Sequence, residues 1–158
     1  MSAYIDKTGT FRYWLKRDVG DGPPLGWLML NPSTADASLD DPTIRRVIGF
    51  TRAWGYGQAW VTNLFALRAT DPAELNRHDE PRGPENEAHV LLMAVACPVV
   101  VCAWGATVDK VRHRWIDVAA IVERNSLAMC LGSTKAGYPR HPLYVRADTE
   151  LVGFGVST

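Results

Sequence analysis

Apolar and polar positions along the first half of the chain predict strands and helices in alternation. Phe11 to Lys16 alternates as a strand, and a Gly/Pro-rich connector leads to a second strand at Trp27 to Leu30. From Pro42 the apolar residues fall at helical spacing until a stop at Gly55, with Asp41 as the cap. Ala59 to Leu67 then predicts a strand that ends at residue 63 or 64.

The second half continues the same alternation. A helix is expected from Pro84 to the stop at Pro98, followed by the continuous apolar run Val99 to Trp104, which is typical of a strand buried on both faces. Residues 107–125 place a valine-rich stripe on one helical face, so one long helix is expected there. Residues 127–131 predict another short strand before a Gly/Pro-rich loop.

This order of elements predicts an α/β fold in which helices connect parallel strands. We expect a single α/β domain over residues 1–158, built as a three-layer α/β/α sandwich. Its centre is a mostly parallel four-stranded sheet, and an N-terminal β-hairpin is added to it. Ligands of such sheets bind beyond the carboxyl ends of the strands, so the residues where each apolar run stops are the candidates for a site.

Composition narrows the class of protein. The chain has 158 residues, 47% of them hydrophobic, which is enough for one core without metal or disulfide staples. Its 17 Lys and Arg balance 17 Asp and Glu, so the general positive field of many nucleic-acid binders is missing. Three cysteines lie in apolar runs without CxxC spacing, which predicts buried thiols and argues against a disulfide framework and a zinc site. We expect no metal and no cofactor.

Targeting and nucleotide-loop motifs are also missing from the sequence. The N-terminal stretch has no apolar core of a signal peptide, and no segment has the roughly 20 apolar residues that span a bilayer. We therefore expect a cytoplasmic protein without a membrane partner. Neither GxGxxG nor GxxxxGK[ST] occurs, which argues against the usual dinucleotide and P-loop sites.

Polar residues follow the first two core strands at the predicted ligand edge. The first strand ends in Asn31, Pro32, Ser33 and Thr34, with Asp36 close behind. An amide, two hydroxyls and a carboxylate can bind a polar ligand, but the same residues also form Asx or ST turns that satisfy only their own backbone. The second strand ends at Asn63, and Arg68 follows.

The loop after the fourth core strand gathers positive charge beside an aromatic ring. Lys135, Tyr138, Arg140 and His141 lie within seven residues of one another. Cations next to a ring that can stack suit a phosphate and a base. The alternative is a solvated basic loop without a ligand.

These strand ends carry a resemblance to known families. The segments "LMLNPSTADASLDDPTIRRVIGFTRAWGYGQAWVTNLFALRATDP", "VVVCAWG" and "GSTKAGYPRHPLYV" resemble a family of uncharacterised bacterial and phage proteins. More distantly, the order of features is similar to the uracil-DNA glycosylase superfamily, which implies a glycosylase-like fold. Met29 stands where that pattern has the Gly of its first motif, and Leu143 stands where it has Ser after His-Pro.

The resemblance implies a nucleobase- or nucleic-acid-processing protein that hydrolyses the N-glycosidic bond of an abnormal or modified base. It assigns Asn31 to the attacking water and His141 to the departing base, and Asp36 is the expected base catalyst. Substrate contacts are expected from the other strand-end residues, Pro32, Ser33, Thr34, Asn63, Arg68, Lys135, Tyr138 and Arg140. The expected partner is a nucleotide, or a single nucleic-acid base with its flanking phosphate.

Three alternatives to a glycosylase stay open at the level of the sequence. The same residues can form a module that binds a nucleotide or modified base without cleaving it. The protein can also be a component of a DNA-modification pathway, or a structural protein whose tryptophans and basic loop form an interface.

Overall fold

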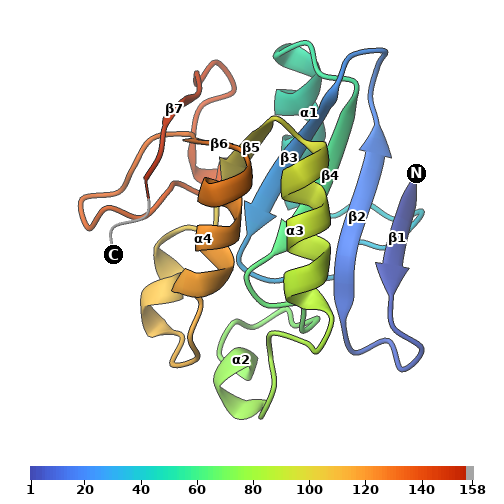
Figure 1. The fold of residues 1–158 in the computed structure, drawn as a ribbon, viewed down its shortest axis with the longest axis vertical. Helices are drawn as coiled ribbons and strands as arrows, with labels where there is room; N and C mark the ends of the chain where they lie inside the picture. Colours follow the sequence, from blue (N-terminus) through green and yellow to red (C-terminus); the bar gives the residue numbers. More distant parts are fainter. Residues whose placement is uncertain (156–158) are drawn as a thin grey trace.

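A computed structural model describes residues 1–155 as one mixed sheet with helices packed against it (Figure 1). The strands are β1 (Ser2–Ile5), β2 (Arg12–Asp18), β3 (Pro24–Met29), β4 (Gln58–Asn63), β5 (Val99–Cys102), β6 (Leu127–Cys130) and β7 (Val152–Gly153). The helices are α1 (Pro42–Ala53), α2 (Glu74–Arg77), α3 (Asn86–Ala96) and α4 (Ile116–Asn125), with 3-10 turns η1 (Ala106–Lys110) and η2 (Pro142–Tyr144).

The seven strands are ordered β1-β2-β4-β3-β5-β6-β7. The inner strands β4, β3, β5 and β6 pair in parallel, as expected when helices make the crossovers. The remaining pairings are antiparallel. The prediction of four strands was therefore too small, because the N-terminal hairpin β1–β2 joins the same sheet through β4, and β7 adds a short edge next to β6.

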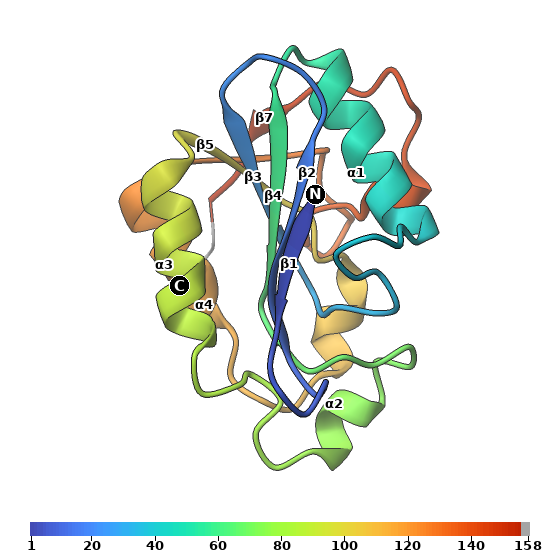
Figure 2. The same ribbon diagram turned by 90° about the vertical axis from the view of Figure 1, so that its right-hand side faces the viewer.

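Helices cover both faces of the sheet (Figure 2). α1 lies on one face, and α3 and α4 lie together on the other. Each helix layer has its own buried apolar cluster, one around Val47 and Phe50 of α1 and one around Val90 of α3 and Val118 of α4. The three-layer arrangement expected from the alternating pattern is therefore present.

The start of α1 follows its capping residues. Asp41 accepts the Ile44 N–H at 2.9 Å, and Pro42 occupies the first helical position. Ile44, Val47 and Phe50 then point to the sheet and are buried, as their spacing predicts. This geometry fixes the first turn of α1 at the edge where β3 ends.

The single helix expected over residues 107–125 was wrong in its first half. The chain forms η1, leaves helical geometry around Val111, and begins α4 only at Ile116. Asn76, in α2, donates to the Lys110 carbonyl at 2.9 Å and accepts the Arg112 N–H at 2.8 Å. These bonds use backbone groups that a continuous helix would pair internally.

The three cysteines are buried free thiols, as predicted. Burial raises the pKa of the Cys97 thiol to about 12 and raises the pKa of Cys102 as well. Both are therefore protonated and unreactive core side chains at neutral pH.

Candidate functional site

A pocket of about 510 Å³ opens at the carboxyl ends of the parallel strands. Its walls come from the loops after β3, β4, β5 and β6 and from the first turn of α1. The loop after β3 leads to α1 on one face, whereas the loop after β5 leads to α4 on the other (Figures 1 and 2). The pocket thus lies at the point where the connections change faces, the usual ligand site of an open α/β sheet.

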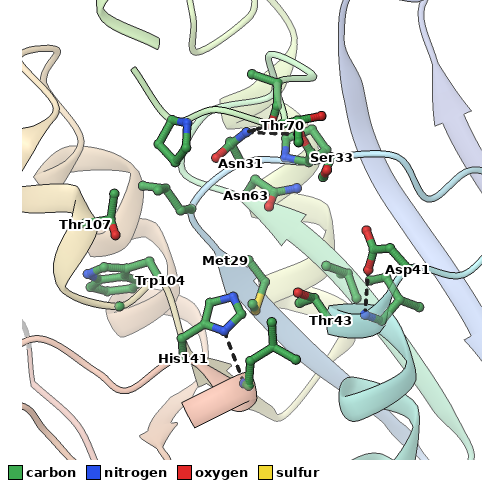
Figure 3. A pocket seen from close by; sticks show the side chains of 18 of the residues that line it. Met29, Asn31, Ser33, Asp41, Thr43, Asn63, Thr70, Trp104, Thr107 and His141 are labelled. Atoms are coloured by element: carbon green, nitrogen blue, oxygen red, sulfur yellow. Dashed lines mark hydrogen bonds between the residues drawn. The ribbon is translucent and has the colours of Figure 1, made fainter. Parts of the chain in front are cut away.

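Six of the residues predicted from the strand ends line this pocket. They are Asn31, Pro32, Ser33, Asn63, Arg140 and His141. In the view of Figure 3, Trp104 and Thr107 lie on one side of the pocket, and Asp41 and Thr43 lie on the other. Residues distant in the sequence therefore meet in one place because parallel strands end at the same edge.

Asn31 is held by its amide nitrogen and leaves its oxygen available. Its Nδ2 donates to the Pro32 carbonyl at 3.0 Å and to the Ala69 carbonyl at 2.9 Å. The side-chain oxygen lies on the opposite side from these bonds (Figure 3). Asn31 can therefore offer a fixed hydrogen-bond acceptor to a ligand or a water.

Asn63 offers the complementary donor. The residue is 1% exposed, and its Nδ2 has no hydrogen-bond partner. Its backbone carbonyl accepts from the buried Asn86 amide at 2.8 Å, which fixes the end of β4. A buried amide without a partner costs about 1–3 kcal/mol, a cost that a ligand acceptor would remove.

His141 is neutral at physiological pH. Burial lowers its pKa to about 4, and the nearby Asp41 only partly opposes this effect. Nδ1 accepts the Leu143 N–H at 3.2 Å, so in the neutral ring the proton is on Nε2. His141 therefore presents a neutral N–H donor beside the pocket.

Gly105 allows the loop that carries His141 to approach the end of β5. Its φ of +76° lies in the left-handed region, and its N–H donates to the Pro139 carbonyl at 2.9 Å. A Cβ at this position would lie 3.4 Å from the His141 Cβ. The glycine at the end of the "VVVCAWG" run thus has a structural role that also shapes the pocket.

Asp36 does not line the pocket. Its Oδ1 accepts the N–H groups of Ser38 at 2.9 Å and Leu39 at 2.8 Å. These hydrogen bonds lower the pKa of Asp36. The carboxylate therefore closes an Asx turn in the loop before α1, which was the alternative interpretation of this motif.

The other four predicted residues also lie outside the pocket wall. Thr34 and Lys135 are exposed on their loops. The Tyr138 hydroxyl donates to Asp109 at 2.7 Å, which turns the ring toward η1. Arg68 lines a separate hollow beside α2.

Several lining residues were not predicted from the sequence, above all Arg12, Asp41, Thr43, Thr70 and Thr107. Asp41 was assigned only as a helix cap, although a cap that follows a core strand in an α/β fold lies at the ligand edge. Arg12 carried a different sequence signal, because it is a charged residue at the start of a strand whose neighbouring residues are apolar and buried or half-buried. Thr43, Thr70 and Thr107 carry no comparable sequence signal.

Residues 1–155 show neither a metal-binding cluster nor a membrane-spanning helix. Within this range, no group of three or more His, Cys, Asp and Glu side chains is placed to hold a metal ion. Of the helices described, none has the length and apolar character to cross a membrane.

Fold and pocket together define an α/β protein with a pocket at the switch point of a mixed sheet, lined in part by polar side chains. Residues 12–143 match the family described as "Protein of unknown function (DUF1643)", and the chain belongs to this family. The description names no activity and makes no link to uracil-DNA glycosylases. Comparisons with the curated proteins and with the solved structures find no match.

Proposed function

We propose that the pocket binds the base of a nucleotide or nucleic-acid residue and that the protein hydrolyses the N-glycosidic bond of that base. One observation carries the proposal: the unpartnered Asn63 amide, the free Asn31 oxygen and the neutral His141 donor line the same pocket. A nucleobase edge with a carbonyl next to an N–H matches such a donor and acceptor pair. The volume of about 510 Å³ is in the range of small-molecule sites.

His141 would stabilise the departing base. When the glycosidic C–N bond breaks, its electron pair goes to the base, and negative charge develops on a carbonyl oxygen. A positioned N–H donor stabilises that charge, and removal of one such donor commonly reduces the rate by about 10²- to 10³-fold. The Nε2–H of a neutral imidazole can perform this role across the physiological pH range.

Asp41 is better placed than Asp36 to receive the proton of the attacking water. Its carboxylate lines the pocket, and one of its oxygens accepts the Ile44 N–H. Water held by the Asn31 oxygen would attack the sugar carbon, and its proton would pass to the Asp41 carboxylate. The leaving base then takes up a proton from solvent, which balances the reaction.

A base-release assay tests this proposal. Oligonucleotides containing uracil, hydroxymethyluracil or a mismatch would be incubated with the protein, and abasic sites would be detected by alkaline strand cleavage. We expect cleavage that falls at least 100-fold in Asn31→Ala and in His141→Ala. Arg52→Met, an exposed change in the last turn of α1, is the matched control. Cleavage that does not depend on Asn31 would exclude the proposed mechanism.

A second candidate is binding of a nucleotide or modified base without cleavage. It is favoured by the fact that Asp41 already serves as the cap of α1, which restricts its role as a proton acceptor. In this case ligands would raise the melting temperature and Asn63→Leu would abolish the shift, with no base released. The two candidates thus differ in product formation and share the same pocket.

A further inference from the structure

Strand β2 buries two arginines, and one of them is fully paired. Arg17 is 1% exposed, and its Nε donates to Asp40 at 2.7 Å. Its terminal nitrogens donate to the carbonyls of Lys16, Asp36 and Leu39. Arg17 therefore has a complete structural explanation, because it holds the loop between β3 and α1 against the sheet.

Arg12 lacks such partners. It is 2% exposed, lines the pocket, and donates from Nη1 to the Ala35 carbonyl at 3.0 Å. Its Nε is buried without a partner, and within residues 1–155 no carboxylate lies at ion-pair distance from it. Burial lowers the pKa of Arg12 to about 10, so the group is still charged at neutral pH. A buried charge of this kind is costly unless something neutralises it.

A β-bulge directs Arg12 toward the pocket. Tyr4 pairs with Trp14 and Ile5 pairs with Arg12, so Tyr13 is the extra residue in β2. Tyr13 packs on His89 of α3, whereas Arg12 reaches Ala35 on the α1 side of the sheet. Bulges are common beside functional sites because they re-aim a side chain in this way.

The surroundings of Arg12 favour an anion. The hydroxyls of Ser33 and Thr70 line the same pocket and can donate hydrogen bonds. Arg68 is near enough that its charge lowers the pKa of Arg12, and Asp41 opposes this effect. Asp41 is also the single carboxylate among the lining residues, against Arg12 and Arg140.

We propose that Arg12 forms an anion subsite that takes a phosphate of the ligand, so the pocket accepts a phosphorylated nucleoside in preference to a free base or nucleoside. The nucleoside part of this statement rests on the proposed function, whereas the anion subsite rests on Arg12 alone. The phosphate belongs either to a free nucleotide or to a nucleic-acid strand. Arginine suits both because its planar fork donates two parallel hydrogen bonds.

Binding measurements on the full chain test the subsite. Calorimetry would compare deoxyuridine, its 5′-monophosphate, inorganic phosphate and a uracil-containing trinucleotide. We expect the monophosphate or the trinucleotide to bind about 10- to 100-fold more tightly than the nucleoside, the gain typical of a charge-assisted hydrogen bond. Preference for the monophosphate would indicate a free nucleotide, and preference for the trinucleotide would indicate a strand.

Arg12→Met should remove this preference and leave the unliganded melting temperature equal or higher, because the uncompensated buried charge is gone. Arg12→Lys should keep part of the preference and provides a second variant if Arg12→Met does not fold. The control Arg52→Met removes an exposed arginine that lies about 15 Å along α1 from the first turn, which lines the pocket. It should change neither the phosphate preference nor the melting temperature. Lower stability of Arg12→Met with an unchanged phosphate preference would overturn the proposal in favour of a structural role.

The outcomes also separate the subsite from the proposed function. Arg12-dependent binding of inorganic phosphate without any nucleoside binding would support the subsite and contradict the nucleobase pocket. Nucleoside binding without a gain from phosphate would support the nucleobase pocket and overturn the subsite. Absence of binding by phosphate, monophosphate and trinucleotide would also overturn it.

Discussion

The protonation state of His141 couples the site to pH. The pKa of the side chain is about 4 in the folded protein against an ordinary value of 6.5. Between these values the unfolded chain binds a proton that the folded chain does not, so stability falls as the pH is lowered from about 6.5 to 4. Acidification therefore favours unfolding through this residue.

The variant His141→Asn should lose part of this acid sensitivity. The amide oxygen can still accept the Leu143 N–H, but no group titrates. Between pH 7 and pH 4, the free energy of unfolding measured in urea should fall less in the variant than in the native protein. The difference between the two losses should be up to about 3 kcal/mol. His113→Asn, outside the pocket wall, is the matched control. Equal acid sensitivity in His141→Asn and the native protein would contradict the assignment.

Two buried asparagines allow a paired comparison of site and scaffold. The Asn63 Nδ2 has no partner, whereas the Asn86 Nδ2 donates to the carbonyls of Asn63 at 2.8 Å and Leu64 at 3.2 Å. Asn63→Leu should leave the free energy of unfolding unchanged or raise it by about 1 kcal/mol, and it should abolish ligand binding. Asn86→Leu should cost about 2–3 kcal/mol because two buried carbonyls lose their donor. Chemical denaturation of both variants checks the difference, and a comparable loss in both would argue against a ligand-directed Asn63.

At the scale of elements, the turn before β3 and the turn before β4 contact each other through their backbones. A Cβ on Gly57 would lie 2.2 Å from the Gly22 carbonyl oxygen and 2.4 Å from the Gly22 nitrogen. Backbone atoms cannot move away as a flexible side chain can, so Gly57→Ala should destabilise the protein by about 2–4 kcal/mol. A Cβ on Gly49, inside α1, would meet no atom within 4 Å apart from its chain neighbours and the backbone of its own helix, so Gly49→Ala should instead stabilise the protein by about 0.5–1 kcal/mol. Thermal unfolding that gave both variants the same sign would contradict this account.

Elements that depend on local pattern were predictable, and those that depend on distant partners were not. The Asp41 cap, the apolar spacing of α1 and the buried run of β5 each follow from residues close in the sequence. The break before α4 depends on Asn76, more than thirty residues upstream, which binds the backbone around Lys110 and Arg112. The insertion of β4 between β2 and β3 is likewise a long-range pairing that no local signal shows.

At the scale of the whole molecule, the same distinction applies to the site. The rule that ligands bind beyond the carboxyl ends of parallel strands placed Asn31, Asn63 and His141 at one edge of the sheet, where they line the pocket. It did not show which side chains turn inward, so Asp36 was expected in the pocket where Asp41 lies. Arg12 enters from an antiparallel strand outside the parallel centre and through a bulge, which the rule does not cover.

The balance of charge over the whole molecule limits how it can engage a nucleic acid. With 17 basic and 17 acidic residues the protein has no general positive field, and Arg12 and Arg140 are the arginines that line the pocket wall. Each phosphate neutralised on a single strand contributes about −0.7 to the slope of log affinity against log salt. A pocket for one nucleotide and one or two phosphates should therefore give a slope of about −1 for a single-stranded oligonucleotide.

Fluorescence anisotropy of a labelled uracil-containing oligonucleotide across a salt series measures this slope. Arg12→Met should make the slope shallower by about 0.7, the contribution of one phosphate, while Arg52→Met should leave the slope unchanged. Lengthening the oligonucleotide should add little affinity, because a protein with a net charge of zero supplies no general positive field for the strand outside the pocket. A slope of about −4 or steeper, growing with oligonucleotide length, would instead indicate an extended nucleic-acid surface, and the pocket would no longer account for binding.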